Sequence, residues 1–279
     1  MSAEKDITLE EKRVYAATSG RTEAFVACGV GLARVAVSDA LVGEFGLVWR
    51  GDARDVAAGA GRLAVGTAED VLLATGGAGG EPAFEPTGFG PADAVGVGRG
   101  DGRDDAERVV AAGEGRVARL DETGWTTLCD LDGVRAVDGD LLAAESGVHR
   151  LDGTHVGLPS ARDVSSTGLP YAATDAGLYY LGNGWMDAHD GAFRTVASDG
   201  ERAHAATDDA LYERGDAPED WAPVDLPAGG RVVDVAHAET TYAVTDDGTL
   251  LAYDPAEEAW RDRPLGLADA RAIAVLESG

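Results

Sequence analysis

The chain has 279 residues, of which 44 % carry apolar side chains, enough for a large buried core. Its formal net charge is −27 at pH 7, from 50 Asp and Glu against 23 Lys and Arg. A surface this acidic is unsuited to nucleic-acid backbones and to anionic membranes, which both attract clusters of Lys and Arg. The longest apolar stretch, residues 25–37, is too short to cross a bilayer and contains Arg34. We therefore expect neither a nucleic-acid nor a membrane partner.

The N-terminal residues indicate the cellular location, and the cysteines indicate whether disulfides or zinc are expected. The first residues, MSAEKDITLEEKR, lack the apolar core of a secretory signal, so we expect a cytoplasmic protein. Cys28 and Cys129 are the only cysteines and lie far apart, which argues against a disulfide framework or a zinc knuckle. Both lie in apolar stretches, and we expect buried, structural thiols.

One pattern, two apolar strands around a tight turn, recurs along the chain. Its clearest copy is YAATDAGLYYL, residues 171–181. Each copy has a large residue, a small residue two positions later, a turn rich in Gly, Asp, Ser or Thr, and a second strand. Because alternate residues of a strand share a face, the large and small positions should pack on one side. The copies begin at Phe25, Leu63, Val110, Leu142, Tyr171, His204 and Tyr242. The small residues are Ala27, Val65, Ala112, Ala144, Ala173, Ala206 and Val244.

Two further motifs flank the hairpins. Before most of them stands Arg, any residue, then Val or Ile, beginning at Arg54, Arg135, Arg162, Arg194 and Arg231, and a further copy begins at Arg271 near the C-terminus. The first copy has Lys12-Arg-Val14 instead, and the third has Asp93-Ala-Val95. After most hairpins an aromatic residue opens a short strand, and we expect these rings in the core: Phe45, Phe84, Trp125, Trp185, Trp221 and Trp260. Each repeat therefore predicts four strands.

Seven tandem four-stranded repeats predict an all-β fold, a seven-bladed β-propeller of four-stranded antiparallel blades in a single domain over 1–279. The expected blades are 11–52, 53–90, 91–133, 134–160, 161–192, 193–230 and 231–268, with 269–279 as a closing strand. Eight candidate inner strands serve seven hairpins, since both 12–18 and 269–276 fit the pattern. We favour a closure in which both termini contribute strands to one blade.

The T-D-x-G turns followed by G-L-Y-x-L strands resemble those of propellers in ligand-sensing and two-component regulator proteins. The acidic excess and the presence of only two lysines, Lys5 and Lys12, resemble proteins of haloarchaea, and the whole resembles an uncharacterised haloarchaeal β-propeller family. That resemblance implies the fold and a high-salt cytoplasm, where a Debye length of about 3 Å near 1 M salt screens self-repulsion. It implies no activity. An ordinary acidic mesophilic protein is the alternative.

The recurring arginines are the candidate ligand-binding residues. In an antiparallel meander, the start of the first strand and the hairpin turn lie at the same end of a blade, so these arginines should surround one mouth of the central channel. One interpretation is an anion site on the axis. The other is structural: each Arg pairs with an acid of its own or the neighbouring blade. The turn acids in question are Asp175, Asp208, Asp246 and Asp247.

Other chemistry has weaker support. The acidic segment 99–109 contains Asp101, Asp104, Asp105 and Glu107, which are candidate Ca²⁺ ligands or simply a solvated loop, because their spacing does not match a calcium loop. The five histidines show no metal-ligand spacing, and we expect His204 to be a hydrogen-bonded interior residue. No nucleophile elbow, P-loop or dinucleotide fingerprint occurs, so we assign no catalytic residue.

These observations favour a non-catalytic propeller that binds a protein partner or a small anionic ligand on its Arg-bearing face. We expect it to be a monomer without a cofactor. The alternative is a lyase- or hydrolase-type enzyme with its site at the axial mouth. Fold alone does not separate them, because propellers support both kinds of function.

Overall fold

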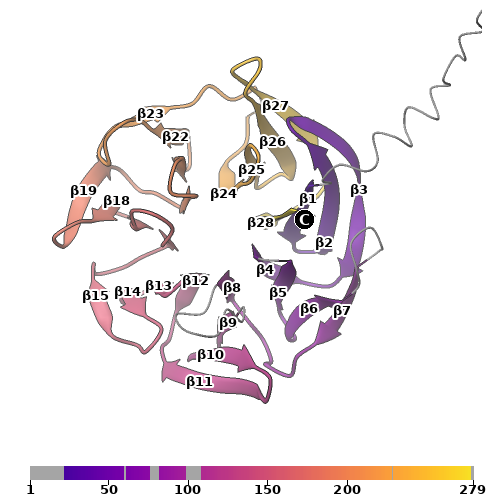
Figure 1. The fold of residues 1–279 in the computed structure, drawn as a ribbon, viewed down its shortest axis with the longest axis vertical. Helices are drawn as coiled ribbons and strands as arrows, with labels where there is room; N and C mark the ends of the chain where they lie inside the picture. The colour runs from indigo at the N-terminus through magenta and orange to yellow at the C-terminus, as the bar shows by residue number, and fades with distance from the viewer. Residues whose placement is uncertain (1–21, 60, 76–81, 99–107, 228, 278–279) are drawn as a thin grey trace, which may run out of the picture.

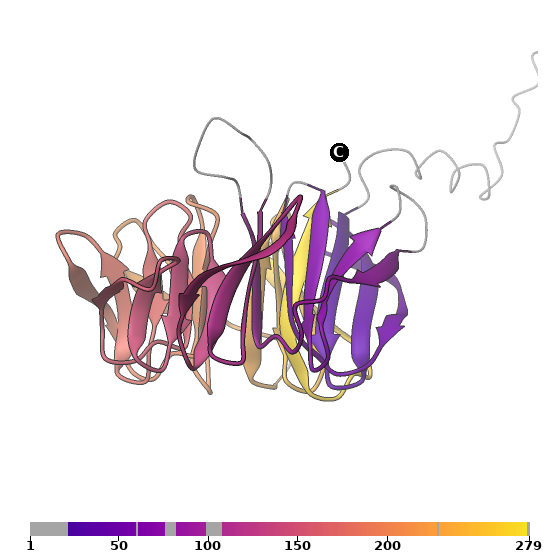
Figure 2. The same cartoon turned by 90° about the horizontal axis from the view of Figure 1, so that it is seen from below.

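A computed structural model describes residues 22–59, 61–75, 82–98, 108–227 and 229–277. Within these residues the regular structure consists of strands, and they form seven four-stranded sheets. The sheets stand around a common axis as seven blades of a ring (Figure 1), and from the side the ring is a shallow disc (Figure 2). A central channel, lined by residues of all seven blades, runs along this axis. All strand pairs within the blades are antiparallel. The predicted all-β, seven-bladed propeller is confirmed.

Each blade uses its four strands in the same order from the channel outward. The innermost strands are β28 (Ala270–Glu277), β4 (Ala53–Gly59), β8 (Ala94–Gly98), β12 (Val134–Asp138), β16 (Asp163–Ser165), β20 (Thr195–Ser198) and β24 (Val232–His237). The second strands are β1 (Thr22–Cys28), β5 (Arg62–Thr67), β9 (Arg108–Gly113), β13 (Leu141–Ala144), β17 (Tyr171–Ala173), β21 (Ala203–Ala206) and β25 (Thr241–Thr245). The third strands are β2 (Gly31–Ser38), β6 (Val71–Thr75), β10 (Arg116–Asp121), β14 (Gly147–Arg150), β18 (Gly177–Leu181), β22 (Leu211–Arg214) and β26 (Thr249–Asp254). The outermost strands are β3 (Leu41–Arg50), β7 (Ala83–Pro86), β11 (Gly124–Asp130), β15 (His155–Gly157), β19 (Trp185–Asp190), β23 (Trp221–Pro223) and β27 (Ala259–Pro264).

The first blade joins the two ends of the described chain. Its order is β28-β1-β2-β3, so the C-terminal strand is innermost and pairs with β1. Ile273 lies opposite Val26 in this pair. The other candidate for the inner position, residues 12–18, lies outside the described residues. Because β28 and β1 are hydrogen-bonded, the last and first strands of the described chain close the ring.

The core lies between neighbouring blades. Seven apolar clusters each join two adjacent blades, because alternate residues of the second strands face opposite neighbours. In β1, Phe25 packs toward the second blade while Val26 packs toward the seventh. The aromatic residues that follow the hairpins belong largely to this core. Trp221 and Trp260 are each 8 % exposed, although Phe45 is 39 % exposed.

The hairpin alignment needs correction in the second and fourth blades. Strand register aligns Gly66 and Ala143 with Ala173 of the fifth blade, where the sequence pattern had placed Val65 and Ala144. As a result, Leu63 packs against the preceding blade, whereas Tyr171 packs against the following one. These second strands are apolar on both faces, so a shift of one residue leaves the sequence pattern intact.

The two cysteines differ in environment. Cys28 is buried, and its thiol lies 3.2 Å from the backbone oxygen of Gly31. Cys129 is only partly buried, so the expectation of two buried thiols is wrong for this residue. Among the described residues, no helix has the length and apolar character needed to span a bilayer.

Candidate functional site

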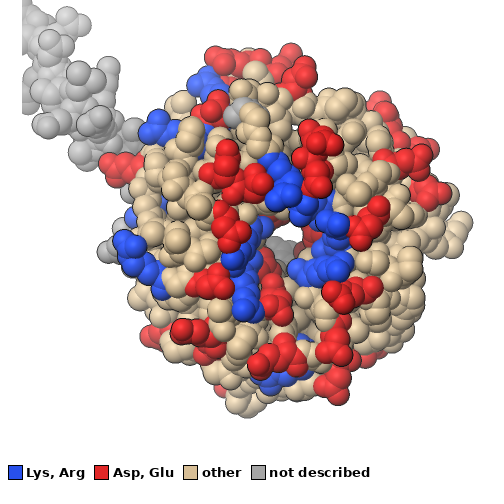
Figure 3. Space-filling view, turned by 180° about the vertical axis from the view of Figure 1, so that it is seen from behind, with Lys and Arg blue, Asp and Glu red and all other residues tan. Residues whose placement is uncertain are grey.

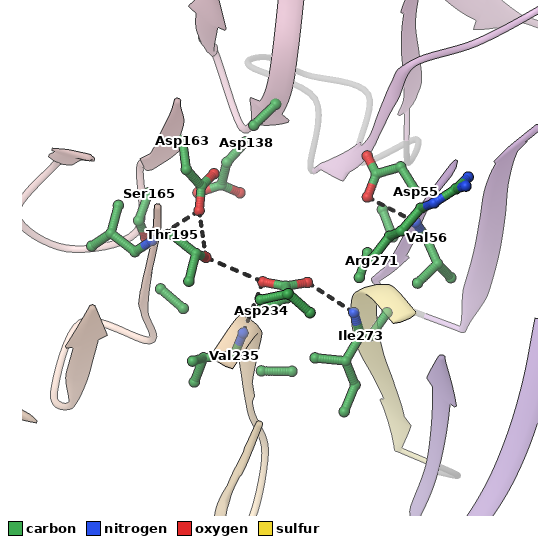
Figure 4. Close-up of a pocket in the computed structure, with 18 of the residues that line it drawn as sticks. Asp55, Val56, Asp138, Asp163, Ser165, Thr195, Asp234, Val235, Arg271 and Ile273 are labelled. Carbon is green, nitrogen blue, oxygen red and sulfur yellow. Dashed lines mark hydrogen bonds between the residues drawn. The ribbon is translucent and has the colours of Figure 1, made fainter. Parts of the chain in front are cut away.

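The central channel is a cavity with a volume of about 1050 Å³. Residues of the innermost strands from all seven blades line it, and Figure 4 shows part of this lining. A cavity of this size lies at the upper end of the range for small-molecule sites. The channel wall is strongly polar because aspartates and arginines project from these strands.

Arginines surround one mouth of the channel. In Figure 3 their side chains form a group around the opening, with acidic side chains just outside them. Of the six predicted arginines, five line the cavity: Arg135, Arg162, Arg194, Arg231 and Arg271. The sixth, Arg54, is next to the lining residue Asp55.

Every one of these arginines pairs with a carboxylate. Arg162 pairs with Asp175 and Arg194 with Asp208, each within its own blade. The remaining pairs are Arg54–Asp93 at 2.6 Å, Arg135–Glu145 at 3.3 Å, Arg231–Asp246 at 3.2 Å and Arg271–Asp52 at 2.7 Å. Several of the acids are exposed, with side-chain exposures of 56 % for Asp175 and 64 % for Asp208. The fourth predicted turn acid, Asp247, accepts a bond from the hydroxyl of Thr245 instead.

The arginine motif is out of register in the seventh blade. Arg162 and Arg194 directly precede the aligned inner-strand residues Asp163 and Thr195. In the seventh blade the aligned residue is Asp234, and Val233 precedes it. Val233 occupies the β-bulge position that Arg54 and Arg135 occupy in the second and fourth blades, and Arg231 stands two positions before it. It nevertheless reaches the mouth, where it also lies 3.7 Å from Asp208 of the sixth blade.

Deeper in the channel, three aligned aspartates connect neighbouring blades. Asp55, Asp163 and Asp234 each accept the backbone N–H of the next residue in their own strand at 2.8 Å. Each also accepts, at 2.8 Å, a backbone N–H from the innermost strand of the following blade. The donors are Val95 for Asp55, Val196 for Asp163 and Ile273 for Asp234. The hydroxyl of Thr195 lies 2.7 Å from Asp163 and 3.4 Å from Asp234, and Figure 4 shows the three side chains converging.

Enclosure in the channel changes the acidity of these carboxyl groups. Burial raises the pKa of Asp55 to about 7 and that of Asp163 to about 6. Burial also raises the pKa of Asp234 well above its ordinary value, and repulsion from Asp163 adds to the effect. The Arg-x-Val pattern does not predict this trio, because it leaves its middle residue unspecified at Asp55 and Asp163 and does not include Asp234. The three share an Asp-Val dipeptide, at 55–56, 163–164 and 234–235, although the same dipeptide also occurs at 70–71, at the start of a third strand.

Two histidines lie near the other end of the channel. Nδ1 of His204 and Nε2 of His237 are 2.9 Å apart, joining the sixth and seventh blades. His204 is 2 % exposed, so the expected hydrogen-bonded interior histidine is confirmed. Burial lowers the pKa of His204 to about 3 and that of His237 to about 4.

Metal binding gains no support from the described part of the chain, where no three His, Cys, Asp or Glu side chains are grouped to hold an ion. The candidate calcium ligands Asp101, Asp104 and Asp105, together with Glu107, lie outside the described residues.

Solved structures of several other proteins share this fold. The chain is similar to apo AztD from Citrobacter koseri, with a TM-score of 0.54 and 12 % identity over 93 % of this chain and 99 % of that one. It is similar to the Pan2 WD40 domain of Neurospora crassa, with a TM-score of 0.59 and 10 % identity over 79 % and 82 %. A chain of a nidogen/laminin complex matches with a TM-score of 0.53 and 12 % identity over 91 % and 98 %. At these identities the likeness concerns the fold alone.

Family assignment comes from the sequence itself. No curated protein matches the chain. The model of the HVO_0234-like beta-propeller family matches residues 8–276, almost the entire length, so the chain belongs to the HVO_0234-like beta-propeller family.

Proposed function

We propose that this propeller is a non-catalytic binding module that holds a small anionic ligand at the arginine-bearing mouth of its channel. The observation that carries the proposal is the convergence of five arginines from different blades on one cavity. Guanidinium groups from several directions suit a phosphate, a sulfate or a polycarboxylate, because each can donate two parallel hydrogen bonds.

The carboxylates at the mouth do not prevent such binding. Asp175 and Asp208 are more than half exposed, and exposed ion pairs contribute only about 0–1 kcal/mol. A ligand that contacts several arginines at once replaces several weak pairs with one multidentate contact. The aspartates deeper in the channel would repel an anion, so the ligand should remain at the rim.

High salt sharpens the requirement for direct contact. We place the protein in a salt-rich cytoplasm as a monomer, on the strength of its net charge of −27. With a Debye length of about 3 Å near 1 M salt, long-range attraction into the mouth nearly vanishes. Only a ligand with close, bidentate contacts would remain bound.

Titration with pyrophosphate in molar KCl, followed by calorimetry and ³¹P NMR, tests the proposal. We expect saturable binding that weakens at least tenfold in Arg162→Gln and Arg194→Gln. Arg150→Gln is the matched control, because Arg150 also pairs with an acid, Asp140, but does not line the channel. Binding that is absent, or equal in all variants, would overturn the proposal. A protein captured stoichiometrically from the native cytoplasm would assign the mouth to a protein partner instead.

An enzyme acting at the axial mouth is the second candidate, and one observation favours it. Asp55 and Asp163 have raised pKa values of about 7 and about 6, which suit a general acid near neutral pH. Incubation with phosphate monoesters, monitored by ³¹P NMR, separates the two functions. Turnover that disappears in Asp163→Asn while ligand binding persists would favour the enzyme.

A further inference from the structure

A serine and a histidine of the fourth blade form a pair that the binding module does not use. Ser146 is exposed in the turn between β13 and β14, and its Oγ lies 2.9 Å from Nε2 of His149. His149 lies in β14 and is 6 % exposed. An accessible hydroxyl is thus in contact with a buried imidazole.

The surroundings of His149 determine its tautomer. Its Nδ1 lies 3.1 Å from the backbone oxygen of Gly153, and a carbonyl oxygen can only accept a hydrogen bond. Nδ1 must therefore carry the proton, which leaves Nε2 as the acceptor for the hydroxyl of Ser146. The ring of His155 packs against that of His149 in an edge-on contact, with 5.0 Å between centroids. These contacts hold the imidazole in the orientation that a general base for Ser146 requires.

The repeat itself does not require this pair. In the aligned hairpin of the fifth blade, the corresponding residues are Ala176 and Tyr179. Among all seven hairpins, only the fourth has a histidine in its third strand. Side chains that serve the repeat recur from blade to blade, as the Asp-Val positions do, whereas this pair occurs once.

The pair also adjoins the arginine-bearing mouth. Ser146 follows Glu145, whose carboxylate lies 3.3 Å from Arg135, a lining residue of the channel. An acyl compound with an anionic group near Arg135 would therefore bring its carbonyl into the neighbourhood of the hydroxyl.

We propose that Ser146 is a nucleophile activated by His149 and that it reacts with activated esters and with phosphonyl groups. Oγ of Ser146 forms a bond to the electrophilic carbon or phosphorus, and its proton passes to Nε2 of His149. With an ester, the bond to the leaving oxygen breaks and His149 returns the proton to that oxygen. Water then hydrolyses the acyl-serine, which releases the carboxylic acid and regenerates the hydroxyl. With a fluorophosphonate, fluoride leaves, His149 releases its proton to solvent and the phosphonyl-serine persists.

Labelling with a fluorophosphonate tests the proposal on the full-length protein in molar KCl. We expect a single adduct by intact mass, located at Ser146 by peptide mapping and absent in Ser146→Ala. In His149→Gln the labelling rate should fall by about 10²-fold or more, the usual contribution of a general base. Ser38→Ala is the control and should be labelled at the wild-type rate, because Ser38 is an exposed serine at the end of β2.

Two results would overturn the proposal. One is labelling of Ser146 in the wild type that is no faster than labelling of Ser38, a comparison that requires no variant. The other is unchanged labelling in His149→Gln when its thermal unfolding matches that of the wild type.

Discussion

The carboxylate of Asp163 in the fifth blade accepts the backbone N–H of Val196 in the sixth blade, at 2.8 Å. The innermost strand of a blade has no further strand on its channel side, so its N–H groups there need another acceptor. An aspartate of the preceding blade supplies it, and the same arrangement recurs at Asp55 and Asp234. Neighbouring blades are therefore joined by polar contacts at the channel as well as by apolar packing.

Replacing Asp163 with Asn should change how stability depends on pH. The pKa of Asp163 is about 6 in the fold and 3.8 in an unperturbed chain, so between these values the folded state binds more protons than the unfolded state. The contribution of this carboxyl to stability is therefore lost as pH rises from 4 to 6, whereas Asn at the same position does not ionise and contributes no such loss. The difference between the two unfolding free energies should shift by up to about 3 kcal/mol in favour of Asn, since one pKa unit corresponds to about 1.36 kcal/mol. Chemical denaturation from pH 4 to pH 8 at constant salt measures it, and parallel curves would contradict it.

Replacing His204 with Phe should also change how stability depends on pH, but with the opposite sign to Asp163→Asn. The pKa of His204 is lowered from 6.5 to about 3 in the fold, so below pH 6.5 the unfolded chain gains a proton that the folded chain does not. The stability that depends on a neutral His204 is therefore present above pH 6.5 and lost as pH falls. The variant should have a shallower slope below pH 6.5, by about 1.4 kcal/mol per pH unit. Thermal and chemical unfolding between pH 4.5 and 8 test this, and an unchanged slope would refute it.

Truncating Ile273 to Ala should weaken the closure of the ring. Ile273 is 4 % exposed and packs in the cluster between the seventh and first blades. Loss of its side chain should cost about 2–5 kcal/mol in unfolding free energy. Leu276→Ala, in the same strand but only partly buried, is the control and should cost less. Equal losses of unfolding free energy in the two variants would show that the buried side chain of Ile273 stabilises the closure no more than the partly buried Leu276 does.

The pair between Arg162 and Asp175 should contribute little to stability. Their side chains are 36 % and 56 % exposed, and a pair this accessible is worth about 1 kcal/mol or less. A double-mutant cycle with Arg162→Gln and Asp175→Asn measures the coupling directly. A coupling above about 2 kcal/mol would instead identify the arginines of the mouth as structural elements.

Much of the architecture could be predicted because each repeat is local. Residues 171–181 contain both strands of a hairpin and its turn, and the contacts between those strands are decided within eleven residues. The pairing of Arg162 with Asp175 followed from the same logic, since both lie at one end of a blade. The bond from Val196 to Asp163 could not be predicted in this way, because it joins two blades and depends on their relative height.

By itself, the sequence determined the number of repeats, their four-stranded composition and the end of the channel at which the arginines gather. Hydrophobic periodicity and turn chemistry act over a few residues, so these features are readable along the chain. Only the tertiary structure decided the one-residue offsets at Gly66 and Ala143, the bulge at Val233 and the convergence of Asp55, Asp163 and Asp234 on the channel. The physical reason is that a strand buried on both faces tolerates either register in its sequence, and packing against the neighbouring blade selects one.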